Sequence, residues 1–406
     1  MTAAAPVLVL DGHTTQALAC VRSLGRAGHR VYVASQRRAA LAAWSRYSRA
    51  RWHLPAETVA DYAALRGWAR DQGVRIVLPL TERSCLLCNA ARADWEAAGI
   101  TVGCGPDDML LQVFDKARAL ARARACGMAT PATYAPTSLA EAEAAAAEVG
   151  FPCVVKARFS YVWHEGEMLS DPGVAYVAHR GDLAAAVMAR RQGTLWPLVQ
   201  RYVSGHGLGL SAVCDRGRVV AWFAHERLRD VRPAGSGSSL RRSVPVDPRL
   251  REAAARLLAD LAWHGPAMFE FRHDDEDPQS PWLIEINGRF WGSLQLAIAA
   301  GADLPRQWIA ILSATPQRGV AAYWPGVTLR WLWGDAQRLL HVVQGPPPGY
   351  PGDYPGVWRG VWEVVGPQPA GTQSETWDST DRWPVVAEWV QGLGELLGQP
   401  LSRARV

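Results

Sequence analysis

Side chains able to do chemistry gather in one short stretch, WLIEINGRFWGSLQLAIAAG at residues 282–301. The letters WLIEI predict a buried strand, which turns at Asn287 and continues as an apolar helix. Because side chains alternate along a strand, Glu285, Asn287 and Arg289 should share one face. That face would carry a carboxylate, an amide oxygen and a guanidinium.

Magnesium takes oxygen ligands and usually combines one or two protein carboxylates with substrate phosphates. Glu285 and Asn287 suit this need, and Arg289 could stabilise charge on a transferred group. Upstream, HGPAMFEFR predicts a second buried strand centred on Glu270, and the acidic segment 273–281 predicts a hairpin loop between the two. The hairpin would bring Glu270 beside Glu285, which favours a metal site over solvated or salt-bridged carboxylates.

This pattern resembles the ATP-grasp superfamily, in which a Glu on one strand and an E-x-N on the next hold the metal ions of Mg-ATP. The continuation N-G-R-F-W-G-S-L and the later A-G-A-D-L-P are similar to its carboxylate-amine ligase branch, related to the carbamoyl-phosphate synthase and biotin carboxylase type of fold. The similarity extends over residues 7–315. It implies ATP and Mg²⁺ as cofactors, with Mn²⁺ as an alternative, and Glu270, Glu285 and Asn287 as metal ligands.

Lysine is almost absent from the chain: of the 43 Lys and Arg residues, only Lys116 and Lys156 are lysine. A lysine is a compact, flexible point charge, whereas arginine is a planar fork. Chance placement is the alternative, but both residues lie where the resemblance expects lysines that bind the phosphates of ATP. We therefore expect both to bind nucleotide.

Length and element pattern predict an α/β protein of several domains, because 406 residues exceed a single core. Short apolar runs alternate with helical patterns over the first hundred residues, which indicates a Rossmann-like parallel sheet. With the resemblance, the expected order is a pre-ATP-grasp domain, an ATP-grasp small lobe, a large lobe and a tryptophan-rich extension. The expected boundaries are 1–112, 113–200, 201–318 and 319–406.

Composition narrows the partners and the compartment. The net charge of +5 is mild and the arginines are scattered, so nucleic-acid binding is not expected. Seven scattered cysteines suggest reduced thiols and a cytoplasmic location, and Cys85 with Cys88 suits two small core residues better than a redox or metal pair. No apolar run suggests a signal peptide or a membrane span. The oligomeric state stays open, with a homodimer as one option.

The first strand is followed by DGHTTQ, not by the glycine pattern of a dinucleotide site. A nicotinamide or flavin enzyme is therefore rejected despite the Rossmann-like layout. Ligands of such sheets bind beyond the carboxyl ends of the strands. His13 and Glu82 are thus candidate substrate residues, together with Asp11 and Thr81, although helix caps and turns explain such residues as well.

The strand WPLVQRYV should link the lobes, and the resemblance implies that its backbone meets adenine at Gln200, Arg201, Tyr202 and Val203. The family commonly has acidic residues where Gln200 and Arg201 stand, so the ribose contact is in doubt. The phosphate-covering loop also departs from the family, because residues 160–174 are long and aromatic instead of rich in Gly and Ser. Two interpretations of this segment stay open: a lid that contacts the substrate itself, or a remodelled loop that binds phosphate more weakly.

A Gly- and Ser-rich segment at 231–239 is flanked by arginines, and the resembling ligases carry a similar loop after an R-x-R strand. Backbone amides and guanidinium groups there could hold phosphate or a substrate carboxylate, with a solvated loop as the alternative. The candidate substrate residues are Arg227, Arg229, Ser238 and Ser239. Arg241 joins Arg289 as a candidate catalytic residue.

Together these features predict an ATP-dependent carboxylate-amine ligase. A carboxylate is a poor electrophile, so its activation as an acyl phosphate would precede attack by the amine, with release of ADP and phosphate. The substrates would be small-molecule or peptide carboxylates and amines. The alternatives are a bicarbonate-activating or phosphoryl-transfer enzyme of the same fold, and a nucleotide-binding regulatory protein without catalysis.

Overall fold

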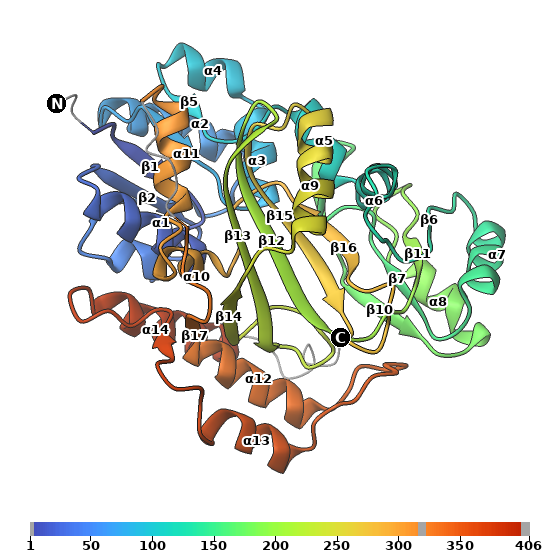
Figure 1. The fold of residues 1–406 in the computed structure, drawn as a ribbon. Helices are drawn as coiled ribbons and strands as arrows, with labels where there is room; N and C mark the ends of the chain where they lie inside the picture. Colours follow the sequence, from blue (N-terminus) through green and yellow to red (C-terminus); the bar gives the residue numbers. More distant parts are fainter. Residues whose placement is uncertain (1–3, 316–321, 399–406) are drawn as a thin grey trace.

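The computed structural model describes residues 4–315 and 322–398 of the chain. Its first domain is a parallel sheet of strand order β3-β2-β1-β4-β5 with helices around it (Figure 1). The strands are β1 (Val7–Val9), β2 (Val31–Ser35), β3 (Ser48–His53), β4 (Ile76–Leu78) and β5 (Thr101–Val102). The helices are α1 (Thr15–Arg26), η1 (Leu41–Trp44), α2 (Val59–Asp71), α3 (Glu82–Asn89) and α4 (Arg92–Ala97). The predicted α/β class and the Rossmann-like layout are confirmed.

Two details of this domain differ from the sequence pattern. Strand β3 was not expected, because SRARWH is polar and alternates between half-buried and exposed positions at the sheet edge. The helical pattern that follows β4 corresponds to two helices, since α3 ends at Asn89 and α4 begins at Arg92. Cys85 and Cys88 are fully buried in the core, as two small core residues would be.

The second unit is a four-stranded sheet of order β10-β7-β11-β6, whose central strand β7 carries Lys156 at its end. Its strands are β6 (Thr133–Tyr134), β7 (Cys153–Lys156), β10 (Val174–Val177) and β11 (Leu198–Arg201). The helices that precede or cover it are α5 (Asp107–Phe114), α6 (Lys116–Ala125), α7 (Leu139–Val149), η2 (Arg180–Asp182) and α8 (Leu183–Met188). Apolar residues from α7, α8 and this sheet form a core of their own.

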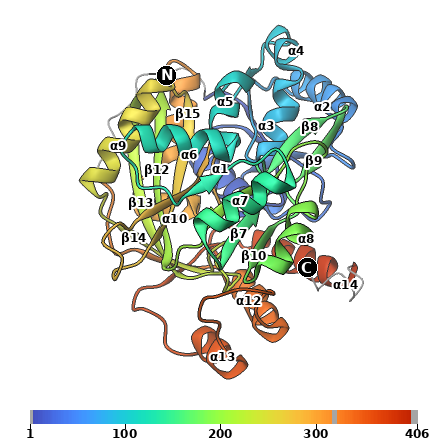
Figure 2. The same ribbon diagram turned by 90° about the vertical axis from the view of Figure 1, so that its right-hand side faces the viewer.

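The covering segment is a β-hairpin, where the sequence suggested a loop. Its strands β8 (Tyr161–His164) and β9 (Glu167–Ser170) pair antiparallel and reach toward α2 and α3 of the first domain (Figure 2). Tyr161 and Met168 pack against a core cluster that includes buried residues of that domain. The segment therefore bridges the small lobe and the first domain.

The large lobe is built on a seven-stranded sheet of order β16-β15-β12-β13-β14-β17-β18. Its strands are β12 (His206–Asp215), β13 (Arg218–Arg229), β14 (Leu240–Val244), β15 (Gly265–His273), β16 (Trp282–Asn287), β17 (Thr328–Arg330) and β18 (Gln373–Ser374). Its helices are α9 (Pro248–Asp260), α10 (Leu294–Ala299) and α11 (Leu304–Leu312). Helices α10 and α11 pack on α1, so the first domain and the large lobe share a core.

The C-terminal extension contributes β17 and β18 to this sheet. Its helices α12 (Leu332–Gln344) and α13 (Val357–Val365), which lie between these strands in the chain, and α14 (Trp383–Gly398), which follows them, lie below the sheet (Figure 1). Asp381 fastens the extension to the first domain, since it accepts hydrogen bonds from Arg22 at 2.9 Å and Ser45 at 2.7 Å.

Parts of the expected domains at 1–3, 316–321 and 399–406 lie outside the described residues. No helix in the described ranges is long and apolar enough to cross a membrane.

Candidate active site

Strands β15 and β16 bring the two candidate metal carboxylates together. Glu270 lies directly opposite Glu285 in their antiparallel register, and Met268 lies opposite Asn287, so the predicted hairpin and its pairing are confirmed. The side chains of Glu285 and Asn287 form no hydrogen bond or ion pair within the described part of the chain. Directly opposed like charges are unfavourable. Oxygen ligands left free beside each other are what a hard divalent cation requires.

No group of three or more His, Cys, Asp or Glu side chains able to hold a metal occurs among the described residues. The candidate site does not depend on one, because two carboxylates and an amide leave the remaining positions to phosphate oxygens and water. Its donor set contains only oxygen. This fits Mg²⁺ or Mn²⁺ better than zinc.

Arg227 holds Glu270 in place from two strands away. Its Nη2 lies 2.7 Å from Glu270 Oε1, and to reach it the side chain must cross strand β12. Gly207 makes the crossing possible, since a Cβ there would stand 2.4 Å from Arg227 Cδ. Burial raises the pKa of Glu270, but Arg227 and two further arginines outweigh this, so the net pKa is lowered and the carboxylate is charged.

Lys156 spans the gap between the two lobes. From the end of β7 its Nζ donates a 3.2 Å hydrogen bond to the carbonyl oxygen of Ile284 on β16, next to Glu285. The side chain is buried, which lowers the pKa of Lys156 to about 8, while Glu285 opposes the shift. An ammonium in this position faces the candidate metal ligands.

Lys116 approaches the same region as the first residue of α6. Its Nζ lies 3.2 Å from Ser160 Oγ and 3.9 Å from Asp171 Oδ2, both on the covering segment. Asp115 caps the helix and also pairs with Arg158, which fixes the turn that carries Lys116. The two lysines of the chain are therefore both buried and close enough to interact electrostatically.

Glu82 is the first-domain residue that the structure brings to this region. It is buried at the start of α3, and burial raises its pKa, an effect opposed by Arg289 and Lys116 and reinforced by Glu285. Its Oε2 has no hydrogen-bond partner among the described residues. A buried carboxyl group thus lies within electrostatic range of Lys116, Arg289 and Glu285.

The linking strand uses its side chains for structure. Gln200 donates to Thr133 Oγ1 at 2.7 Å, the Arg201 guanidinium lies 4.4 Å from the Trp282 ring centre, and the Tyr202 ring packs edge-on against Tyr176 and Tyr350. The backbone N–H of Val203 makes no hydrogen bond within the described chain. This N–H is therefore free to contact adenine, as the prediction requires. None of these side chains replaces the acidic residue that would bind the ribose.

Several other predicted residues serve different contacts. Arg229 forms a two-pronged pair with Asp335 of α12, with both distances 2.9 Å, and Arg241 pairs with Glu375 beside β18. The structure thus commits both guanidinium groups to the extension. The hydroxyl oxygen of Ser239 accepts a hydrogen bond from Arg229, and that of Ser238 accepts one from Arg241.

His13 lies at the same edge of the first sheet as Glu82, but its Nδ1 faces Ser35 at 3.4 Å, and its charged neighbours include Arg37 and Glu395. Burial lowers its pKa, so the ring is neutral near pH 7. Asp11 accepts hydrogen bonds from Thr81, Ser84 and the Leu80 backbone. It ties β1 to the loop before α3, as a turn residue would.

Sequence reasoning missed two buried groups around the site, Glu57 and His225. Glu57 is paired with Arg83 at 3.0 Å, and burial together with Asp11 raises its pKa to about 7. Tyr161 of the covering hairpin lies near both. His225 is buried beside Gly209 on the face that carries Glu270, and burial, Arg227 and Arg241 lower its pKa well below the usual value. The glycines at alternate positions of HGLGL were the signal in the sequence that side chains of a neighbouring strand cross over β12.

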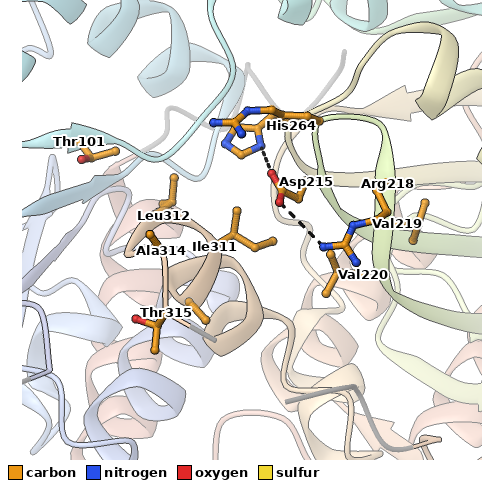
Figure 3. Close-up of a pocket in the computed structure, with 12 residues that line it drawn as sticks. Thr101, Asp215, Arg218, Val219, Val220, His264, Ile311, Leu312, Ala314 and Thr315 are labelled. Carbon is orange, nitrogen blue, oxygen red and sulfur yellow. Dashed lines mark ion pairs between the residues drawn. The ribbon is translucent and has the colours of Figure 1, made fainter. Parts of the chain in front are cut away.

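A cavity of about 780 Å³ is lined by none of these residues. Figure 3 shows it between the β12–β13 turn, β5 and the end of α11, with Asp215 placed between His264 and Arg218. Much of the lining is aliphatic, from Val219, Ile311 and other residues, and it contains neither lysine nor any of the paired glutamates. The convergence of charged groups at β15–β16 identifies the candidate site better than cavity volume does.

Comparison with solved structures gives the fold its name. A biotin carboxylase from Campylobacter jejuni, solved as a beta-gamma-ATP complex, superposes with a TM-score of 0.61 over 79% of this chain and 74% of its own, at 16% identity. An N5-carboxyaminoimidazole synthetase from Staphylococcus aureus does so with a TM-score of 0.60 over 81% and 82%, at 12% identity. The protein has an ATP-grasp fold.

A family model described as ATP-grasp in the biosynthetic pathway with Ter operon matches residues 196–333, from the linking strand into α12. The ATP-grasp fold is shared also with the biotin carboxylase domain of 2-oxoglutarate carboxylase from Hydrogenobacter thermophilus, solved as a dimer with MgADP and bicarbonate. That superposition has a TM-score of 0.62 at 14% identity, over 79% of this chain and 73% of the other. No curated protein matches the sequence. The expected resemblance to the ATP-grasp superfamily is confirmed.

Proposed function

We propose that this protein is an ATP-dependent ligase that joins a carboxylate to an amine through an acyl phosphate, with release of ADP and phosphate. The observation that carries the proposal is the meeting of three structural units at one place. The large lobe supplies Glu270 and Glu285, the small lobe supplies Lys156, and the first domain supplies Glu82. A site shared in this way can bind nucleotide and a second substrate together.

ATP would lie between the lobes, with its phosphates toward Lys116 and Lys156 and its adenine toward the backbone at Arg201 and Val203. Glu270, Glu285 and Asn287 would hold the metal. Bound Mg²⁺ supplies charge neutralisation and orientation of the phosphate oxygens. The side-chain oxygen atoms of Glu285 and Asn287 support this assignment, because they have no hydrogen-bond or ion-pair partner in the part of the chain that the structure describes.

The chemistry requires no side-chain nucleophile. A carboxylate oxygen of the first substrate attacks the γ-phosphorus, the bond to ADP breaks, and an acyl phosphate forms. The amine then attacks the acyl carbon, phosphate leaves with the electron pair of the broken C–O bond, and the nitrogen loses a proton. Arg289 would stabilise charge on the transferring group.

Glu82 is the group that we assign to the amine. It is buried, its Oε2 has no hydrogen-bond partner among the described residues, and burial raises its pKa, which makes the carboxylate a stronger base. Tyr161 of the covering hairpin lies on the same side of the site. The hairpin would thereby help to close the site over the second substrate and exclude water, which would otherwise hydrolyse the acyl phosphate.

Activation of bicarbonate is the second candidate, because the similar structures include biotin carboxylases and one of them was solved with bicarbonate. In that reaction bicarbonate would replace the carboxylate substrate, and carboxyphosphate would be the activated species. Phosphoryl transfer without ligation and nucleotide binding without turnover are further outcomes that an assay separates.

The deciding experiment measures nucleotide products from Mg-ATP in the presence of pooled amino acids, peptides and small carboxylates, with hydroxylamine added as a trap. The proposal expects ADP, phosphate and a hydroxamate only when the right carboxylate is present, and faster turnover when the right amine is added. AMP and pyrophosphate would contradict it. ADP released with bicarbonate alone would transfer the assignment to the second candidate, and tight ATP binding without turnover would favour a regulatory role.

Glu82→Gln separates the two halves of the reaction. The variant should still form hydroxamate from carboxylate and ATP, because Glu82 is not assigned to phosphates or metal. Turnover with the natural amine should fall about 10²-fold, as expected for loss of one general base. Equal loss of both activities would show that Glu82 acts on the first half-reaction instead.

A further inference from the structure

Helix α14 directs its charged side chains toward the protein. Glu388 is buried and accepts hydrogen bonds from Trp331 Nε1 at 2.5 Å and Thr376 Oγ1 at 2.9 Å. Glu395 pairs with Arg37 of the first domain at 3.3 Å, and Gln391 donates to the carbonyl oxygen of His13 at 3.3 Å. These polar contacts fix which face of the helix looks inward.

The outward face of α14 is apolar. Five side chains along it are between 44% and 87% exposed, namely Trp383, Val386, Val390, Leu393 and Leu397. Their spacing is three, four, three and four residues, with Trp389 and Leu396 exposed beside them. We call these seven residues the α14 seam. Solvent-facing helices normally show the opposite arrangement, with charges outward.

The spacing indicates what the seam contacts. Five residues of the seam alternate by three and four, as in a stripe along which one helix packs on another, and Trp389 and Leu396 widen this stripe along one side. A membrane surface fits poorly. Helices that lie on membranes carry Lys and Arg on their polar face, and the charged residues of α14 are two glutamates.

We propose that the α14 seam is the contact surface for α14 of a second copy of this chain, in a two-fold symmetric dimer. In such a dimer the same surface of each subunit forms the interface, so each α14 seam packs against the identical seam of its partner. An antiparallel arrangement centred on Val390 places the N-terminal end of each helix beside the C-terminal end of the other, so the helix dipoles attract.

The available area is sufficient. From the exposed fractions of its residues, the α14 seam would bury on the order of 800 Å² on each subunit, the area per partner of a standard stable interface. The only charged residues of α14 are the inward-facing glutamates, so the contact would bury no charge of this helix. Dimerisation through α14 is independent of the catalytic proposal.

The first test measures mass in solution by analytical ultracentrifugation over the micromolar range. The wild-type chain should sediment at twice its mass of 44.2 kDa. Val390→Glu should shift it to the monomer, because a carboxylate would be buried at the centre of the seam. Val343→Glu is the matched control, since Val343 is 69% exposed on α12 outside the seam, and it should stay dimeric.

Cross-linking tests the geometry. In an antiparallel dimer centred on Val390, that position meets its own copy, so Val390→Cys should form an intermolecular disulfide under mild oxidation while Val343→Cys should not. A monomeric wild-type protein would overturn the proposal, as would a Val390→Glu variant that remains dimeric. Monomers that float with anionic vesicles and lose this binding in Val390→Glu would assign the α14 seam to a membrane instead.

Discussion

Arginines and carboxylates meet in two parts of the large-lobe sheet, with opposite outcomes. Beside the extension, Arg229 and Asp335 satisfy each other with two hydrogen bonds, and both are almost fully buried. At β15–β16, Arg227 pairs with Glu270 and not with Glu285, whose side chain has no hydrogen bond or ion pair among the described residues. The first arrangement attaches a structural segment, whereas the second keeps charge available for a ligand.

The difference has an energetic meaning. A buried pair is costly to break because the remaining charge loses its compensation. Two carboxylates facing each other are costly to keep, and a fold tolerates them where a bound cation and its phosphates will offset the repulsion. Removing the charge of Glu285 and removing the charge of Asp335 should therefore have opposite effects on stability.

The largest expected effect comes from Glu285→Gln. The variant keeps the shape of the side chain but removes a metal ligand charge, so kcat should fall by about 10³-fold or more, and the magnesium requirement should rise. Without ligand, the free energy of unfolding should be unchanged or higher by about 0.2–1 kcal/mol, because the like-charge repulsion with Glu270 is relieved. Magnesium titrations of turnover and a melting curve measure both quantities.

Glu270→Gln provides the matched comparison at the same metal site. It should also suppress turnover, and the double variant should lose less than the sum of the single losses, since the two residues act as a unit. Unlike Glu285→Gln, it should lower the stability, because the buried Arg227 loses its charged partner. Wild-type magnesium dependence in both variants would remove β15–β16 from the site.

The second effect is on stability alone. Asp335→Asn should destabilise the fold by about 3–5 kcal/mol, because Asp335 is buried and compensates both Arg229 and Arg330. Turnover per folded molecule should change little, since the pair faces the extension. Urea unfolding and active-site titration separate the two outcomes.

Asp353→Asn serves as the control, because Asp353 pairs with Arg359 at 2.6 Å but both side chains are exposed. Exposed pairs contribute at most about 1 kcal/mol. If both substitutions cost equally little, the buried arginine pairs do not hold the extension, and the contrast between the two regions fails.

The site residues that lie close to one another in the sequence were predictable. Strand alternation and a polar loop are local signals, so Glu270, Glu285 and Asn287 could be placed on one face of a hairpin before the structure was known. The scarcity of lysine was a second local signal, and it singled out two residues that are buried at the lobe junction. For these residues, composition and periodicity carry the information.

The pairing of distant charges was not predictable. Arg229 and Asp335 are 106 residues apart, and almost every basic residue is arginine, so nothing in the pattern indicates which arginine meets which carboxylate. The sequence therefore suggested Arg229 and Arg241 as substrate or catalytic groups, although the extension occupies both. The covering hairpin was missed because its strands are short and lie against another domain, whose contacts decide its structure.

The smallest expected effect is the pH dependence of stability and of ATP binding that Lys156 causes. Burial lowers the pKa of Lys156 to about 8, against about 10.4 in an unfolded chain. Between these values the unfolded chain binds the proton and the ligand-free folded protein does not, so stability should rise with pH over this window. ATP reverses the preference, because its phosphates favour the charged ammonium.

Binding of ATP above pH 8 should therefore take up a proton at Lys156, and the apparent affinity should weaken by up to about tenfold for each further pH unit. Lys156→Arg should flatten this dependence, because a guanidinium keeps its charge throughout the range. Lys156→Met should bind weakly at every pH. Calorimetry at pH 9 in two buffers of different ionisation enthalpy measures the proton uptake directly. A wild-type affinity that is constant from pH 7.5 to 9.5 would place Lys156 away from the phosphates and leave Lys116 as the remaining lysine able to meet them.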